Sequence, residues 1–282
     1  MKAFLQLVRA PAALTVLGDT VAGAAAAGKP LRGRRLLLPL SSVSFYWAGM
    51  ALNDWADREL DAVERPERPI PSGRVTPELA LAVAGGLTAA GLGLARAAGG
   101  RDTLKIAIPL AAAVWAYDTV LKNTVAGPAA MAACRALDVL MGAGPNPRQA
   151  LPSAIAVGGH TLGVTALSRG EVHGASATTA RTVLAGTGLT ALTAVAGARK
   201  WRDRLAALAF TGVYAGTVGR AQYAAAQNPA APQVRSATMA GIHGMVPLQA
   251  ALAARRGSLL GAAVVAAALP VAKILARKVS PT

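Results

Sequence analysis

The sequence is poor in charged residues, in aromatic residues and in cysteine. Asp, Glu, Lys and Arg make up 15% of its 282 residues, whereas soluble globular domains carry about 25%. Together with a mean hydropathy of +0.42, this shortage excludes a disordered chain and argues against an ordinary water-soluble enzyme. The single cysteine, Cys134, excludes an intrachain disulfide framework and a CxxC metal site.

Small apolar residues are abundant instead. Hydrophobic residues account for 54% of the chain and aromatic residues for only 4%. Small side chains let membrane helices approach one another closely, and several apolar stretches reach roughly 18 residues, the length that crosses a bilayer. The composition therefore predicts an all-α, polytopic membrane bundle in a lipid bilayer. We expect one domain over residues 1–282, because no segment is left for a separate soluble domain.

The apolar stretches predict nine or ten transmembrane helices, and the helix over 236–253 is the least clearly marked. The predicted spans are residues 11–28, 36–55, 78–98, 104–121, 126–143, 150–168, 179–198, 203–221, 236–253 and 257–276. If all ten cross, both termini face the same side, and the loops after the second, fourth and sixth spans share it. Basic residues are nearly balanced between the two sides, so the positive-inside rule does not orient the bundle.

The net charge of +16 raises the question of nucleic-acid binding. The 29 basic residues are dispersed between apolar segments, at loop positions, and do not gather on one face or arm. Nucleic-acid binding needs such a concentrated basic surface, so no nucleic-acid partner is expected.

An acidic cluster follows the second predicted span. Only 13 acidic residues occur in the chain, and six of them fall between positions 54 and 67. Asp54, Asp57 and Asp61 are spaced i, i+3, i+7, which predicts one shared helical face, and Asn53 adjoins it. Mg²⁺ prefers such oxygen ligands together with substrate phosphates. The alternative is a solvated acidic loop whose charges pair with neighbouring arginines.

The chain continues as Arg65-Pro66-Glu67-Arg68-Pro69-Ile70-Pro71-Ser72-Gly73-Arg74. Its prolines stiffen the loop, because each favours an extended residue before it. We expect this loop to hold Arg65, Arg68 and Arg74 near the carboxylates, where guanidinium groups suit bidentate phosphate contacts. The alternative is a basic surface loop that contacts lipid headgroups.

The pattern NDxxDxxxD followed by RPxRPIPSGR resembles the first signature of the UbiA superfamily of intramembrane prenyltransferases. Within it, the sequence looks most similar to actinobacterial proteins of secondary metabolism, including the EboC-like group. The resemblance implies a bundle around a central cavity and an integral protein of the bacterial plasma membrane. It also implies Mg²⁺ held by Asp54, Asp57 and Asp61, and a prenyl diphosphate bound by basic residues.

The resemblance extends to the fourth span, where the family places a Tyr and a diphosphate-binding Lys. Tyr117 and Lys122 resemble that pair, although they are five residues apart and the family's usual spacing is four. The alternative for Lys122 is a lysine that extends its side chain from the membrane boundary to water.

The segment after the sixth span departs from the family. The second aspartate-rich motif expected there is missing, and Glu171 is its only acidic residue. Glu171 remains a candidate metal ligand, Arg169 is a candidate diphosphate contact, and a degenerate site is the third alternative.

Three further ionisable residues lie within predicted spans, where charge is costly and faces the bundle interior. Arg135 and Asp138 are spaced i, i+3, which favours mutual neutralisation, with a role in the cavity as the alternative. Asp19 has no local partner and is also expected to face inward.

The implied reaction ionises a prenyl diphosphate and transfers the prenyl group to an aromatic or lipophilic small-molecule acceptor. Lys122 and Arg65, Arg68 and Arg74, with Asn53 and Tyr117, would bind the diphosphate. A terpene cyclase and a non-catalytic carrier of a lipophilic precursor remain alternatives. An ion-coupled transporter is disfavoured, because no inverted repeat is visible.

Overall fold

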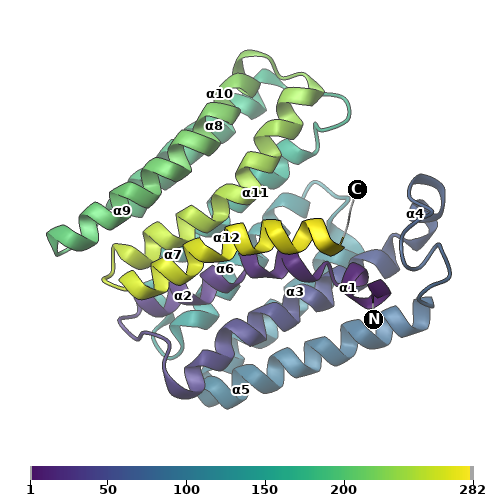
Figure 1. Cartoon of the computed structure of the whole chain (residues 1–282), viewed down its shortest axis with the longest axis horizontal. Helices are drawn as coiled ribbons and strands as arrows, with labels where there is room; N and C mark the ends of the chain where they lie inside the picture. Colours follow the sequence, from purple (N-terminus) through teal and green to yellow (C-terminus); the bar gives the residue numbers. More distant parts are fainter. Residues whose placement is uncertain (1, 280–282) are drawn as a thin grey trace.

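The computed structural model describes residues 2–279, and helices with short connections make up this part of the chain. No strand occurs within residues 2–279, so the all-α prediction is confirmed there. The long helices run side by side as one bundle (Figure 1).

The elements follow one another with few interruptions. They are α1 (Lys2–Leu7), η1 (Ala10–Thr15), α2 (Leu17–Ala26), η2 (Gly33–Leu36), α3 (Leu37–Ala56), α4 (Arg58–Glu64), α5 (Pro77–Ala116), η3 (Tyr117–Leu121), α6 (Gly127–Ala143), α7 (Pro147–Ser168), α8 (Ala177–Val195), α9 (Trp201–Tyr214), η4 (Ala215–Gly219), α10 (Arg220–Gln227), α11 (Ala231–Ala254) and α12 (Leu259–Val279). All ten predicted spans fall on these helical segments. By length and hydropathy, Pro77–Leu121 and Pro147–Ser168 qualify as membrane-crossing helices. The number of spans, nine or ten, therefore stays a prediction.

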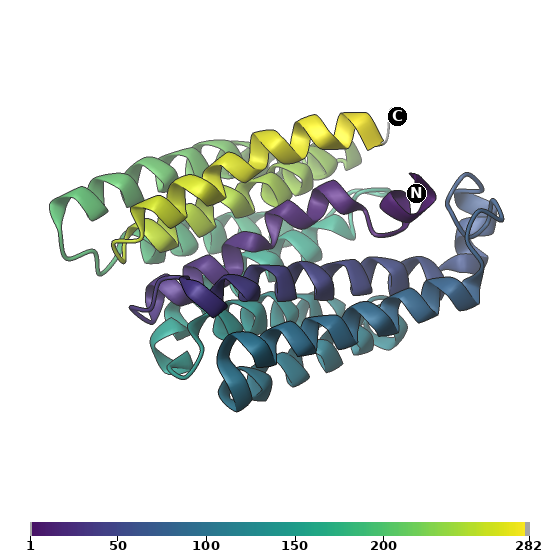
Figure 2. The ribbon, with the colours of Figure 1, turned by 60° about the horizontal axis from the view of Figure 1, so that its bottom comes forward.

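Helix α5 contains two of the predicted spans. It starts where Thr76 accepts a hydrogen bond from the Leu79 amide, with proline at the first position. Its helical geometry breaks at Gly99 and Gly100, and Gly100 has a φ of 65°, which glycine adopts without strain. The chain turns back there (Figure 2). The two arms then lie together, since the Trp115 indole donates to the Thr88 hydroxyl at 3.0 Å.

Helices α2 and α6 cross at very short range because both present glycine. A methyl group on Gly23 would overlap the Val139 carbonyl, and one on Gly142 would overlap the backbone of Thr20. Small residues allow this approach of two backbones. The crossing brings Asp19 of α2 against the inward face of α6, which carries Arg135 and Asp138.

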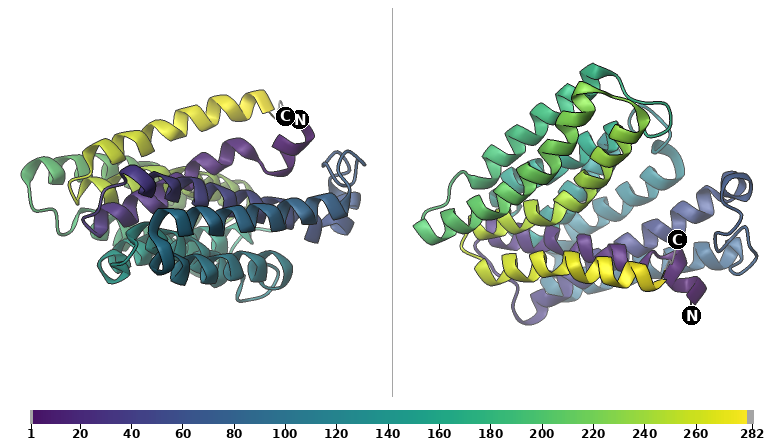
Figure 3. Two further views of the ribbon diagram at one scale, coloured as in Figure 1. Left: turned by 90° about the horizontal axis from the view of Figure 1, so that it is seen from below. Right: turned by 45° about the horizontal axis from the view of Figure 1, so that its top comes forward.

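The two ends of the described chain lie at the same end of the bundle. Helix α1 contacts α12, and the last turns of α12 lie beside it (Figure 3). If the chain crosses the bilayer an even number of times, its two ends are expected on the same side. The end of α3 and the loop carrying α4 are also found at that end of the bundle (Figure 1).

Candidate active site

The acidic cluster lies where α3 gives way to α4. Asp54 belongs to the last turn of α3, Asp57 is the residue at which that helix ends, and Asp61 follows in α4. Asp54 is 4% exposed and Asp61 is 1% exposed. These two carboxylates are therefore enclosed by protein, unlike those of a solvated acidic loop.

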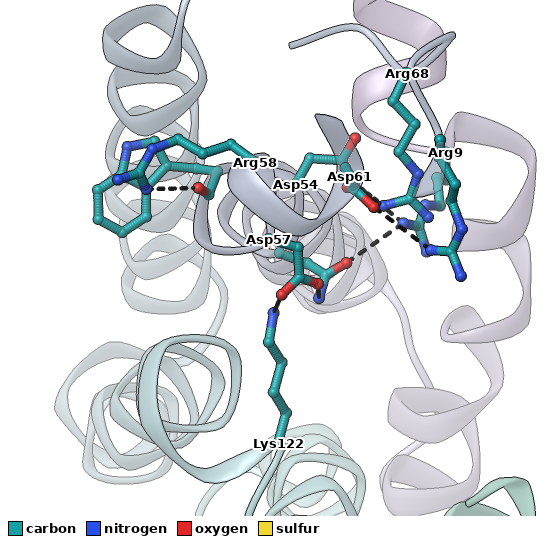
Figure 4. A network of polar contacts seen from close by, with 10 residues as sticks. Arg9, Asp54, Asp57, Arg58, Asp61, Arg68 and Lys122 are labelled. Atoms are coloured by element: carbon teal, nitrogen blue, oxygen red, sulfur yellow. Dashed lines mark hydrogen bonds and ion pairs between the residues drawn. The ribbon is translucent and has the colours of Figure 1, made fainter. Parts of the chain in front are cut away.

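Arginines from two separate segments contact the buried carboxylates (Figure 4). Arg68 reaches Asp61 at 2.6 Å and Asp54 at 3.3 Å through the same nitrogen. Arg9 contacts Asp54 at 3.1 Å and the amide oxygen of Asn53 at 3.4 Å. Arg65 lies 3.7 Å from Asp61. The proline-rich loop thus holds Arg65 and Arg68 against the carboxylates, as expected.

Asp57 lies on a different side from its two neighbours. Its carboxylate pairs with the Lys122 ammonium at 2.6 Å and accepts a hydrogen bond from Asn53 at 3.2 Å. Figure 4 shows Asp57 directed toward Lys122, away from Arg68. The expectation of one shared face is corrected here. Asp57 is the single residue between α3 and α4, and the backbone hydrogen bonds to Asn53 and from Asp61 continue through it, so its contacts with Lys122 and Asn53 set the direction of its carboxylate.

A π-helical turn places Lys122 at the site. The segment Tyr117–Leu121 is π-helical, and the Lys122 amide bonds to the Tyr117 carbonyl five residues earlier at 2.9 Å. In a π turn, residues five apart occupy the relation that residues four apart have in an α-helix. The unusual spacing of Tyr117 and Lys122 is therefore compensated by the local backbone.

Arg74 takes a different position from the other loop arginines. It donates to the side chains of Gln6 at 2.5 Å and Ser72 at 2.8 Å. These contacts tie the loop to α1. Among its recorded contacts within residues 2–279, none joins Arg74 to the three carboxylates, in contrast to the expectation from the sequence. The prolines fix the loop path, and only the folded chain determines which guanidinium points inward.

The segment after α7 adjoins the same end of the bundle. Arg169 donates to the carbonyl of Thr124, and also to that of Lys122 at 3.4 Å. The Glu171 carbonyl accepts from Arg235 at 2.8 Å. The loops after the predicted second, fourth and sixth spans therefore share one face. No group of three His, Cys, Asp or Glu side chains within residues 2–279 converges as a metal site, so both the set Asp54, Asp57 and Asp61 and Glu171 stay predictions as metal ligands.

A cavity extends from this site into the bundle between α3, α5, η3 and α6. Its volume is about 120 Å³. Asp118 lines the end nearest the acidic cluster, where it interacts with Asn53 and Lys122. The aromatic rings of Phe45, Tyr46 and Tyr117 form part of the wall.

The far end of the cavity is polar. Arg135 pairs with Asp19 at 3.0 Å, and Asp138 instead accepts a hydrogen bond from Ser42. The predicted pairing of Arg135 with Asp138 is therefore wrong as their main contact. The close crossing of α2 over α6 supplies Asp19 as the partner, which sequence spacing does not reveal. Asp19 itself is fully buried, as expected.

Arg9 is the site residue that sequence reasoning missed. In the sequence it reads only as a basic residue preceding the first span. In the structure it is the one non-glycine residue within residues 2–279 with a positive φ, 46°. Such backbone outliers cluster at functional sites. The left-handed turn between α1 and η1 directs its guanidinium toward Asp54.

The fold and the site together describe an intramembrane-type helical bundle that places carboxylates and cations at one mouth of an internal cavity. A sequence profile described as the UbiA prenyltransferase family matches residues 14–242. The chain belongs to that family. The match is to the family as a whole, so the EboC-like subgroup stays a prediction.

Curated relatives share part of the chain. A digeranylgeranylglyceryl phosphate synthase of Methanopyrus kandleri is 40% identical over 44% of this chain and 45% of its own length. A protein of the same name from Ignicoccus hospitalis is 46% identical over 34% of this chain and 32% of its own. The matches thus span less than half the length of these relatives.

Solved structures share the whole fold. A structure described as that of digeranylgeranylglyceryl phosphate synthase has a TM-score of 0.69 at 17% identity, covering 92% of this chain and 98% of its own. A UbiA homologue from Archaeoglobus fulgidus, bound to GPP and Mg²⁺, has a TM-score of 0.64 at 13% identity, covering 89% of this chain and 99% of its own. At such identities the likeness concerns the fold alone.

Proposed function

We propose that this protein is an integral-membrane, Mg²⁺-dependent prenyltransferase that ionises a prenyl diphosphate and transfers the prenyl group to a small-molecule acceptor. The observation that carries the proposal is the pairing of buried carboxylates with arginines and a lysine at the mouth of an apolar cavity. Family membership, the relatives' names and the GPP- and Mg²⁺-bound homologue support it. The bacterial plasma membrane is the proposed location.

The donor atoms at the mouth are of the kind that Mg²⁺ takes, although the three carboxylates do not converge as a preformed site. Asp54, Asp57 and Asp61 offer carboxylate oxygens, and Mg²⁺ takes one or two carboxylates and completes its shell with substrate phosphates and waters. Glu171 is the more distant candidate. When bound, Mg²⁺ would neutralise the negative charge that develops on the departing diphosphate.

The cations of the chain would hold the diphosphate. Arg68 and Lys122 neutralise the carboxylates of Asp61 and Asp57. Both cations therefore lie beside the carboxylates that would hold Mg²⁺, where the diphosphate would bind. Arg9 and Arg65 reach the same carboxylates from the exposed side, with side chains 39% and 51% exposed. Asn53 and Tyr117 lie between these groups and the cavity. We assign Arg74 a supporting role in the loop, on the strength of its contacts with Gln6 and Ser72.

The cavity would receive the prenyl group. Ionisation of the carbon–oxygen bond leaves an allylic cation, which water would quench. A closed, mostly apolar interior protects the cation until the acceptor attacks it. The aromatic wall formed by Phe45, Tyr46 and Tyr117 offers ring faces to the positive charge.

Pyrophosphate release tests this function. The purified protein in lipid vesicles would be given geranyl, farnesyl and geranylgeranyl diphosphate, with Mg²⁺ or EDTA and a lipid extract as acceptor source. We expect Mg²⁺-dependent release that is lost in Asp54→Ala and Asp57→Ala. Asp102→Ala is the matched control, because Asp102 is an exposed carboxylate that pairs only with Lys105.

The outcomes separate the alternatives. A prenylated acceptor among the products supports transfer, whereas a cyclic hydrocarbon or alcohol formed from the donor alone would show a terpene cyclase. If the wild-type protein binds diphosphates but releases no pyrophosphate from any donor, the enzyme proposal is wrong and the carrier alternative replaces it.

A further inference from the structure

The cavity has two polar ends, and only one of them belongs to the diphosphate site. Asp118 lies against Gly49, where an added methyl group would stand 3.3 Å from its carboxylate. Ser42 lines the opposite end, together with Arg135 and Asp138. Ser42 and Gly49 are seven residues apart on α3, which at 1.5 Å per residue is about 10 Å. The far end therefore lies about 10 Å along α3 from the Asp118 end of the cavity, which is the end nearer the acidic cluster.

The cation at the far end is already in use. Both oxygens of Asp19 face Arg135, with Nε 3.0 Å from one and a terminal nitrogen 3.3 Å from the other. Gln249 adds a hydrogen bond to Asp19 at 2.7 Å. Arg135 and Gln249 also donate to the Thr15 carbonyl. Asp19 Oδ1 thus accepts two hydrogen bonds, whereas Asp19 Oδ2 has the ion pair with Arg135 and no hydrogen-bond partner within residues 2–279.

Asp138 is less completely bonded. It is 5% exposed and lines the cavity. Ser42 donates to one of its oxygens, while the other, Oδ1, has no hydrogen-bond partner within residues 2–279. A buried acceptor atom without a donor is unfavourable, and nearly all such atoms in proteins find one. Because Asp138 lines the cavity, a hydrogen-bond donor bound there can reach its carboxylate.

We propose that Asp138, oriented by Ser42, anchors the acceptor substrate through a neutral hydrogen-bond donor such as a hydroxyl group. The inference rests on the proposed prenyl transfer and specifies the acceptor's chemical class. Two carboxyl groups face one guanidinium at this end, so an acceptor that brings an anion there is disfavoured. A terpene cyclase binds no second substrate, so a hydrogen-bond acceptor at this end of the cavity would have no use in it. The anchor therefore favours prenyl transfer over cyclisation.

The anchor acts on recognition and orientation. Because it lies about 10 Å along α3 from the Asp118 end of the cavity, the hydrogen-bond donor that it holds is distinct from the atom that attacks the prenyl cation. Asp138 and Ser42 are therefore binding residues. They would fix one end of the acceptor while the other end faces the allylic carbon.

Three naphthalenes of one shape test the proposal. They are 2,6-dihydroxynaphthalene, its dimethyl ether, and 6-hydroxy-2-naphthoate, which replaces one hydroxyl by a carboxylate. Their dissociation constants would be measured by fluorescence titration with the protein in vesicles. For the wild type we expect the diol to bind at least tenfold more tightly than either of the others.

Substitutions then locate the anchor. Asp138→Leu removes the acceptor atom and should abolish the preference for the diol over the ether. Asp138→Asn keeps an acceptor atom without the charge and should bind the carboxylate more tightly than the wild type does. Ser42→Ala should weaken the preference. Ser41→Ala is the control, because Ser41 is the buried neighbour that bonds to the Gly91 carbonyl and does not line the cavity.

The two proposals fail in different ways. Equal binding of the diol and the ether by the wild type, or an unchanged preference in Asp138→Leu, would overturn the anchor. That result is expected if a proton shared with Asp19, which interacts with Asp138, satisfies the free oxygen. Pyrophosphate release measured on the same samples is independent of these probes. Its absence from the wild type would overturn prenyl transfer, whatever the naphthalenes show.

Discussion

Two ionic networks in this protein use the same residue types and differ in their balance. The mouth network consists of Arg9, Asp54, Asp57, Asp61, Arg65, Arg68 and Lys122, and the interior network of Asp19, Ser42, Arg135, Asp138 and Gln249. At the mouth, four cations meet three carboxylates. In the interior, two carboxyl groups share one guanidinium. The excess of cations at the mouth suits an anionic ligand, and the excess of carboxyl groups in the interior suits a neutral hydrogen-bond donor.

The networks differ also in the solvent contact of their outer cations. At the mouth Arg9 and Arg65 are 39% and 51% exposed, although Arg68 and Lys122 are only 20% and 12% exposed, whereas in the interior Asp19 and Arg135 are 0% and 14% exposed. Exposed ion pairs contribute little to stability and can exchange partners. Breaking a buried pair leaves an uncompensated charge in a poorly polarisable interior, which is strongly destabilising. Arg9 and Arg65 can therefore rearrange around a substrate, while the interior network fixes the helices that line the cavity.

The largest expected effect comes from the mouth carboxylates. Asp54→Asn should lower Mg²⁺-dependent pyrophosphate release by ~10³-fold, because charge stabilisation of a leaving group depends on such preorganised partners. Its unfolding temperature should stay close to that of the wild type. Steady-state kinetics and thermal unfolding, measured on one preparation, check this. A large loss of stability with unchanged release per folded molecule would contradict it.

Arg135 should show the reverse behaviour. Arg135→Met leaves Asp19 buried without its cation and should cost about 3–5 kcal/mol of unfolding free energy. Chemical denaturation in detergent measures the change. Lys105→Met is the control, because the Lys105–Asp102 pair is exposed and its removal should leave the denaturation midpoint unchanged. Equal midpoints for both variants would remove the distinction between the networks.

Lys122 comes next in size. Lys122→Met should lower the rate of pyrophosphate release by ~10²-fold, in the range found for removal of one group that stabilises developing charge. Lys122→Arg should recover part of the rate, since the positive charge is retained while its distance from the backbone changes. We would measure kcat and KM for the prenyl diphosphate. Unaltered constants in Lys122→Met would show that this ammonium only neutralises Asp57.

The close crossing of α2 and α6 holds Asp19 beside Arg135 in the interior network. Gly142→Ala should cost about 1–3 kcal/mol of unfolding free energy, because the methyl group meets the Thr20 backbone and neither helix can give way cheaply. Gly86→Ala, in an open position on α5, should instead be neutral or slightly stabilising. The comparison of the two denaturation midpoints tests whether close backbone packing, and not helix propensity, governs the result.

The smallest effect is expected for Arg74. Because its recorded contacts are with Gln6, Ser72 and the Glu67 carbonyl, Arg74→Ala should change the KM for a prenyl diphosphate by less than about twofold. Arg68→Ala should raise it by ~10-fold or more, since charge-assisted contacts to phosphate are the strong ones. Similar KM values for the two variants would show that Arg74 contacts the diphosphate as Arg68 does.

Much of the mouth could be predicted from local sequence. Each of its predicted parts lies within one short segment, where the residue types and their spacing indicate the chemistry. These parts are the spacing of Asp54 and Asp61, the proline-rich loop with its arginines, and the lysine after the fourth span. The contact of Asp57 with Lys122 could not be predicted, because it joins two segments that lie far apart in the sequence. Arg9 was missed for a related reason, because its role depends on one left-handed residue that brings a distant segment to Asp54.

Composition and periodicity alone predict a helical, apolar chain with one acidic cluster, because both act within a few turns of the chain. The partners of the buried charges depend on how the helices pack. Asp19 meets Arg135 across 116 residues, and Ser42 meets Asp138 across 96. Such pairs follow from which glycines allow two helices to touch, and that depends on the packing of the whole bundle. A buried charge must find a partner, but only the packed fold determines which one.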